Sequence, residues 1–90
     1  MKDVTVGQVV RSIAGRDKGR FYVVMGFEGK RVLLVDGFNR KLERPKKKNI
    51  LHIQLTNVVN PDIKDKLQKG DLVRDEEIYK FVKKLYEKEG

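Results

Sequence analysis

The sequence contains no cysteine, a single histidine and a single serine. The absence of cysteine excludes disulfides, thiolate zinc sites and cysteine nucleophiles, and it fits a reducing cytoplasm. His52 belongs to no histidine–carboxylate cluster with the spacing of metal ligands, and Ser12 has no paired base in view. We therefore expect a protein that is not an enzyme and that needs no cofactor or metal.

Long apolar runs are also missing. The longest, such as residues 32–35, are far too short to span a membrane, and the N-terminal residues 1–10 hold no apolar signal core followed by a cleavage site. We expect a soluble, cytoplasmic protein with no membrane partner. A chain of 90 residues makes one small domain with a small core and little room for a deep active-site cleft.

The charge is strongly basic and unevenly distributed. The chain has 21 Lys and Arg against 13 Asp and Glu, a net charge of +8. Residues 1–59 hold 13 basic and 5 acidic side chains, whereas residues 60–90 hold 8 of each. Because the whole excess lies in the first two-thirds of the chain, we expect one surface there to face a polyanion.

The first two-thirds of the chain has the pattern of short β-strands. Runs rich in apolar and β-branched residues occupy residues 9–13, 20–26, 31–35 and 50–55. Turn signals lie between these runs, at residues 15–19, 28–30 and 36–37. This spacing predicts a small barrel or sandwich. Pro45 argues against a helix at residues 44–48, so we expect a basic loop that leads into the last strand.

The last third changes to a helical period. Asn60 and Pro61 predict the start of a first helix, and Gly70 predicts its end. A second helix is expected to begin near Arg74 or Asp75. Its apolar stripe comprises Ile78, Phe81, Val82, Leu85 and Tyr86. We expect this stripe to pack on the barrel or on the first helix, with a dimer interface or a partner-protein groove as the alternative.

A glycine-rich segment at residues 7–20 resembles the KOW motif of ribosomal proteins and NusG-type transcription factors. The matching positions are Gly7, Val10, Gly15, Asp17, Lys18, Gly19 and Val24. Gly15 and Gly19 can adopt positive φ and reverse the chain, and Asp17 can bond neighbouring backbone amides to close the loop. The sequence departs from the motif at Ser12, where Val is common, and at Tyr22, where many members carry a further glycine.

A second resemblance lies in the segment Leu34-Val35-Asp36-Gly37, which is similar to the "VDG" segment of the archaeal and eukaryotic fourteen-e group of large-subunit ribosomal proteins. Together the two segments cover about residues 4–58 and also resemble small bacterial KOW proteins related to that group. The resemblance implies an SH3-like β-barrel at residues 1–59. Two short helices at residues 60–90 would pack on it as part of one globular unit.

The resemblance also implies binding to structured RNA, most simply ribosomal RNA, by a ribosomal or ribosome-associated protein. The expected phosphate-binding residues are Arg16, Lys18, Arg20, Arg40, Lys41, Lys46, Lys47 and Lys48, followed by Arg11 and Arg31. Phe38 and Asn39 are candidates for stacking on and hydrogen bonding to an unpaired base, although for Phe38 packing on the barrel is the favoured alternative.

Two other functions fit the sequence. One is a KOW-type protein-interaction module in transcription or translation, with ribosomal or transcription proteins as partners. The other is a basic DNA-binding protein of the nucleoid type. The sequence leaves open which RNA is bound, the oligomeric state and the role of the two helices.

Overall fold

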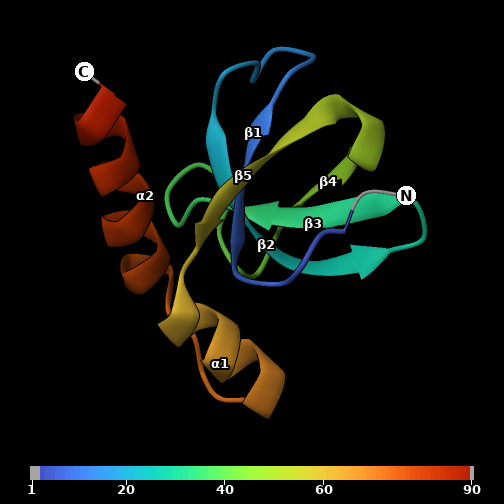
Figure 1. Cartoon of the computed structure of the whole chain (residues 1–90). Helices are drawn as coiled ribbons and strands as arrows, with labels where there is room; N and C mark the ends of the chain where they lie inside the picture. Colours follow the sequence, from blue (N-terminus) through green and yellow to red (C-terminus); the bar gives the residue numbers. More distant parts are fainter. Residues whose placement is uncertain (1–2, 90) are drawn as a thin grey trace.

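The computed structural model describes residues 3–89 and contains a five-stranded antiparallel sheet followed by two helices (Figure 1). The elements in chain order are β1 (Gln8–Ser12), β2 (Phe21–Glu28), β3 (Arg31–Val35), β4 (Lys46–Asn49), the 3₁₀ helix η1 (Ile50–His52), β5 (Ile53–Val59), α1 (Pro61–Lys69) and α2 (Asp75–Glu89). The predicted class, mainly β with C-terminal helices, is confirmed. No helix within residues 3–89 combines the length and the apolar character needed to cross a bilayer.

The strands are ordered β4-β3-β2-β1-β5, so that β2 pairs with both β1 and β3. Irregularities in register lie between Val24 and Gly26 on β2 and between Gln8 and Val10 on β1, and such bulges bend and twist a sheet. The strands β4 and β5 stand at the two edges and are joined by η1. Within residues 3–89 no strand pairing joins these two edges, so the curved sheet is not closed into a hydrogen-bonded barrel.

Residues 44–48 were expected to form a basic loop, but from residue 46 onward they belong to strand β4. Strand β4 pairs antiparallel with β3, with Lys46 opposite Leu34 and Lys48 opposite Val32. The loop prediction for residues 44–48 was therefore wrong for residues 46–48. Pairing with β3 overrides the low strand propensity of lysine, as tertiary context often does. The strand expected at residues 50–55 begins only at Ile53, because η1 takes up the three residues before it.

Both faces of the sheet are covered, which explains the uninterrupted apolar run at the start of β2. Successive strand residues point to opposite faces. The side facing the helices holds Val9, Phe21, Val23, Val35, Ile63, Val73, Ile78 and Val82, which we call the helix-side core. The concave side holds Val10, Tyr22, Val24, Val32, Leu34 and Ile53, which we call the inner core. Helix α2 thus lies against the sheet through Ile78 and Val82.

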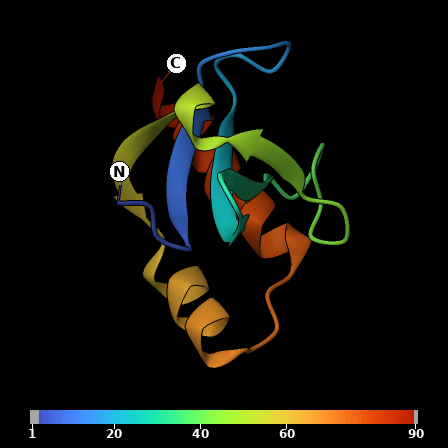
Figure 2. The same cartoon turned by 90° about the vertical axis from the view of Figure 1, so that its right-hand side faces the viewer.

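The first helix has the ends that its sequence predicts. Asn60 Oδ1 accepts hydrogen bonds from the backbone N–H groups of Asp62 and Ile63, both at 3.0 Å, and Pro61 occupies the first turn. Gly70 ends the helix in the left-handed conformation with φ of 75°. Figures 1 and 2 both place α1 at the end of the molecule opposite the β1–β2 loop.

Candidate nucleic-acid interface

The β1–β2 loop (residues 13–20) is built around a buried carboxylate. Asp17 accepts hydrogen bonds from Ser12 Oγ at 2.9 Å, Tyr22 Oη at 2.8 Å and Lys48 Nζ at 2.8 Å. Lys46 Nζ lies 3.2 Å from the same carboxylate. We call these five residues the Asp17 cluster. It ties the loop to β1, β2 and the edge strand β4.

The cluster fixes the charge state of its members. Burial alone would raise the pKa of Asp17, but the hydrogen bonds from Lys48, Tyr22, Ser12 and Lys46 outweigh it and hold the pKa well below the ordinary value of 3.8. Burial and the neighbouring Asp17 carboxylate raise the pKa of Tyr22 well above its ordinary 10.0. Asp17 is therefore anionic and Tyr22 neutral across the physiological range.

This arrangement corrects the expected role of Asp17. Within the described chain its carboxylate accepts hydrogen bonds from side chains, not from neighbouring backbone amides. The loop is closed instead by backbone bonds, among them Gly19 N–H to the Ser12 carbonyl at 2.8 Å. Gly15 and Gly19 do adopt positive φ, at 85° and 94°. The two departures from the KOW pattern, Ser12 and Tyr22, are both donors to Asp17.

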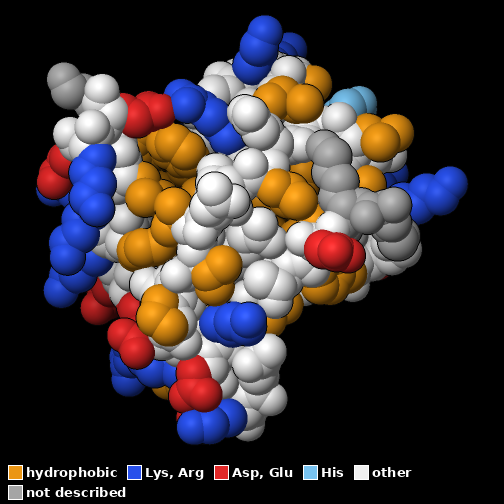
Figure 3. Space-filling view, in the orientation of Figure 1, with side chains coloured by type: hydrophobic (Ala, Val, Ile, Leu, Met, Phe, Trp, Pro, Cys, Tyr) orange, Lys and Arg blue, Asp and Glu red, His pale blue; other side chains and the backbone are white. Residues whose placement is uncertain are grey.

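The cations of this loop are held outside the cluster. Arg16, Lys18 and Arg20 are exposed. The ion pairs found in residues 3–89 involve none of these three, nor Arg40 or Lys41 on the β3–β4 loop. In the face shown in Figure 3, Lys and Arg side chains project at the end of the molecule where the β1–β2 loop lies. These five cations are therefore available to an anionic ligand.

The three lysines of β4 differ from those five. Lys48 is buried, with 9% of its side chain exposed, and it donates both to Asp17 and to the Ala14 carbonyl at 2.8 Å. Lys46 is half-buried at Asp17, and Lys47 pairs with Glu28 at 3.1 Å on the surface. The predicted basic loop is a strand here, and alternation along that strand turns Lys46 and Lys48 to the same face, toward Asp17.

Arg11 and Arg31 have contrasting surroundings. Arg11 donates to the Gly19 carbonyl at 3.0 Å, pairs with Glu89 at 2.7 Å and lies 4.7 Å from the centre of the Phe21 ring. Its guanidinium thus links β1 to the end of α2. Arg31 is exposed at the start of β3.

A tight turn follows β3 at the Val35-Asp36-Gly37 segment. Asp36 Oδ1 accepts hydrogen bonds from the backbone N–H groups of Phe38 at 2.9 Å and Arg40 at 2.8 Å. Gly37 has φ of 79°, and a Cβ atom there would lie 2.3 Å from the carbonyl oxygen of Asp75. Only glycine fits, because the turn packs directly on the first turn of α2. The carboxylate of Asp75 in turn accepts a hydrogen bond from Leu42 N–H at 2.8 Å.

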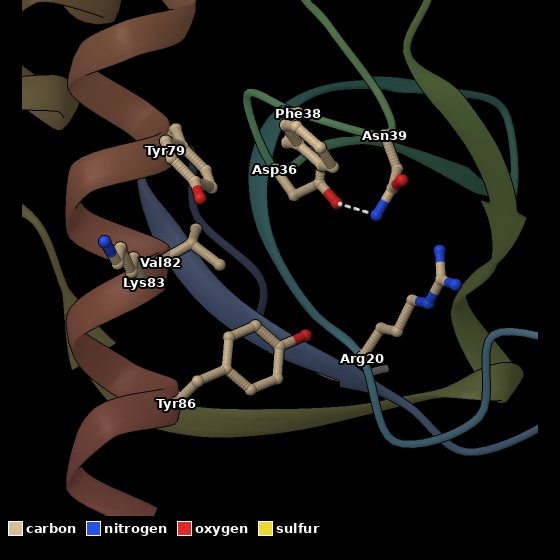
Figure 4. Close-up of a pocket in the computed structure, with 8 residues that line it drawn as sticks. All are labelled: Arg20, Asp36, Phe38, Asn39, Tyr79, Val82, Lys83 and Tyr86. Atoms are coloured by element: carbon tan, nitrogen blue, oxygen red, sulfur yellow. Dashed lines mark hydrogen bonds between the residues drawn. The ribbon is translucent and has the colours of Figure 1, made fainter.

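The turn and α2 form the two walls of a cleft of about 390 Å³ (Figure 4). Phe38 and Asn39 line it from the turn, and Arg20 lines it from the end of the β1–β2 loop. The helix contributes Tyr79, Val82, Lys83 and Tyr86, and Asp36 completes the lining. Three residues expected at an RNA interface, Arg20, Phe38 and Asn39, are thus brought together. Sequence reasoning missed Tyr79 and Lys83, whose spacing of four on one helix was the available signal.

Phe38 is exposed rather than packed in the core. The residue is 64% exposed, and its ring stacks on Tyr79 with centroids 5.5 Å apart and planes at 28°. The alternative expected from the sequence, packing on the barrel, is replaced by this contact with α2.

No protein-family model matches the chain, and no curated protein matches it either.

Proposed function

We propose that the protein is a non-catalytic RNA-binding protein, ribosomal or ribosome-associated, that holds structured RNA through its basic face. The observation that carries the proposal is that some of its basic side chains form ion pairs and others do not. The β4 lysines are paired with carboxylates, whereas Arg16, Lys18, Arg20, Arg40 and Lys41, on the β1–β2 and β3–β4 loops, belong to no ion pair within residues 3–89. Loops fixed by internal bonds and carrying free cations suit phosphate contacts, which dominate affinity for nucleic acids.

The fold we propose for residues 1–59 is a small SH3-like barrel of the KOW type. In its support, β1 and β2 stand at the centre of a strongly bent sheet, and η1 carries the chain from one edge strand to the other. The KOW-like segment at residues 7–20 supplies β1 and the loop that follows it. A fold does not fix a function, so the RNA assignment depends on the cations and needs its own test.

Replacing Arg16, Lys18 and Arg20 together by alanine tests the proposal. Each phosphate contact contributes about 0.7–0.9 to the slope of log affinity against log salt, so losing three should flatten the slope by about 2–3. Stability should change by less than about 0.5 kcal/mol per substitution because all three side chains are exposed. Binding to ribosomal RNA, followed at several salt concentrations, measures the slope, and urea unfolding checks the fold.

The charge-matched control is Lys80→Ala, Lys84→Ala and Lys88→Ala. These exposed lysines recur every four residues on α2, and Figure 3 shows Lys and Arg side chains along the outer side of this helix. The control loses the same net charge and should keep the wild-type slope. Equal slopes in both triple variants would contradict the site assignment. Salt-insensitive capture of a protein partner, without RNA affinity, would favour the protein-interaction module instead.

A further inference from the structure

We propose that the cleft between the turn at residues 36–40 and α2 is a stacking site for one unpaired base of the RNA, with Phe38 as its platform. The inference rests on the RNA-binding function proposed above and goes beyond it by assigning part of the site to the C-terminal helix. It also assigns a role in RNA binding to residues 60–90, although their net charge is zero. The base would enter from the side where Phe38 is exposed.

The aromatic geometry supports a stack of three rings. One face of the Phe38 ring lies on Tyr79, and the residue is still 64% exposed. A ligand that covers this ring would remove apolar surface from water, which favours binding. Every base has a flat π face, and stacking on an aromatic side chain does not depend on its identity. A base on the open face of Phe38 would extend the existing Phe38–Tyr79 stack.

The groups around the platform suit the rest of a nucleotide. Arg20 and Lys83 line the cleft from the loop and from the helix, and neither belongs to an ion pair within residues 3–89. Figure 4 shows Arg20 extending toward Asn39 across the cleft from the helix. Asn39 donates one amide hydrogen to Asp36 at 3.4 Å, which orients the amide beside the platform. Two cations can thus meet the flanking phosphates while the amide meets a base edge.

The cleft is also rigid before any ligand arrives. The backbone of the turn is fixed by Asp36, and Gly37 lets the turn lie directly against the first turn of α2. Farther along the helix, Tyr86 Oη accepts a hydrogen bond from Phe21 N–H at 2.8 Å and packs edge-on against the Phe21 ring at 5.1 Å. Both walls are therefore held by contacts within the protein itself. A preformed site loses less entropy on binding, which favours this platform over a mobile surface aromatic.

The test uses a hairpin RNA with 2-aminopurine in its loop and a second hairpin with the same base paired in the stem. The fluorescence of 2-aminopurine reports stacking of that one base. The variant is Phe38→Leu, which keeps an apolar contact with Tyr79 but removes the π face, and Phe38→Trp restores one. The matched control is Phe27→Leu, since Phe27 is 50% exposed at the far end of β2 and lines a different surface.

We expect Phe38→Leu to weaken binding of the loop-labelled hairpin by at least about 5-fold and to abolish its fluorescence change. Its salt slope should stay at the wild-type value because no phosphate contact is removed. Phe38→Trp should recover the affinity, and Phe27→Leu should match the wild type. Unchanged binding in Phe38→Leu, or a loss that Phe38→Trp fails to recover, overturns the stacking site while the RNA-binding function stands. A wild-type protein that binds neither hairpin overturns both.

Discussion

Replacement of Asp17 by alanine removes the carboxylate on which the β1–β2 loop is assembled. The side chains of Asp17 and Lys48 are only 6% and 9% exposed, so the variant leaves a buried ammonium without its counter-charge. Breaking such a pair costs about 3–5 kcal/mol, against a total of about 5–15 kcal/mol for a small domain. Tyr22 and Ser12 lose an acceptor as well. We expect the melting temperature to fall by about 12–40 °C.

Urea unfolding followed by circular dichroism measures this loss. Lys47→Ala is the control on the same strand, because Lys47 and Glu28 form an exposed pair worth at most about 1 kcal/mol. In the double variant Asp17→Ala, Lys48→Met, the orphaned ammonium is gone, so part of the stability should return. A loss below about 1 kcal/mol in Asp17→Ala, or strictly additive effects in the double variant, would refute the structural role of the cluster.

The same cluster predicts how stability depends on pH. The pKa of Asp17 is lower in the folded protein than its ordinary 3.8. At pH values between the folded and the unfolded pKa, the unfolded chain therefore binds more protons at Asp17 than the folded protein does. The contribution of Asp17 is therefore complete above about pH 5 and is lost as the pH falls toward the folded value. The stability gap between wild type and Asp17→Ala should narrow from about pH 5 to about pH 2. A gap that stays constant over this range would contradict the ion pairing.

Two further substitutions test how the helices are attached. Gly37→Ala should cost more stability than Gly29→Ala, because both glycines have positive φ but only at Gly37 would the Cβ meet Asp75 O at 2.3 Å and Tyr79 N at 2.6 Å. Hydrogen exchange should show α2 opening more often in Gly37→Ala, and equal costs in the two variants would contradict the close approach. Asn60→Ala should lower the free energy of unfolding by about 1 kcal/mol through loss of the α1 cap, and an unchanged urea midpoint would argue against that cap.

Features set by neighbouring residues were predicted well. The ends of α1 follow from Asn60, Pro61 and Gly70, whose preferences act within one turn of helix. Strand β3 was predicted with its observed bounds, Arg31–Val35, because glycine turn signals flank a short uninterrupted run of valine and leucine. The positive φ of Gly15 also follows from its place in a tight reversal.

Features set by distant residues were missed. The partner that buries Lys48 is Asp17, 31 residues away, and no local pattern connects them. Strand β4 forms because β3 offers it backbone partners, although lysine-rich segments rarely suggest a strand. The helix side of the cleft was missed for the same reason. The sequence places Tyr79 on a helix, but only the packing at Gly37 brings it to Phe38.

The position of β4 at the edge of the sheet has a consequence for the behaviour of the protein in concentrated solution. An edge strand offers free backbone groups to a second molecule, and lysines on such a strand prevent that pairing by repulsion between like charges. Of the three lysines on β4 only Lys47 is exposed, so Lys47 is the residue that disfavours such pairing, whether or not it contacts RNA. Replacing Lys47 by an apolar residue should therefore raise the tendency of the protein to self-associate at high concentration, an effect separate from any loss of an RNA contact.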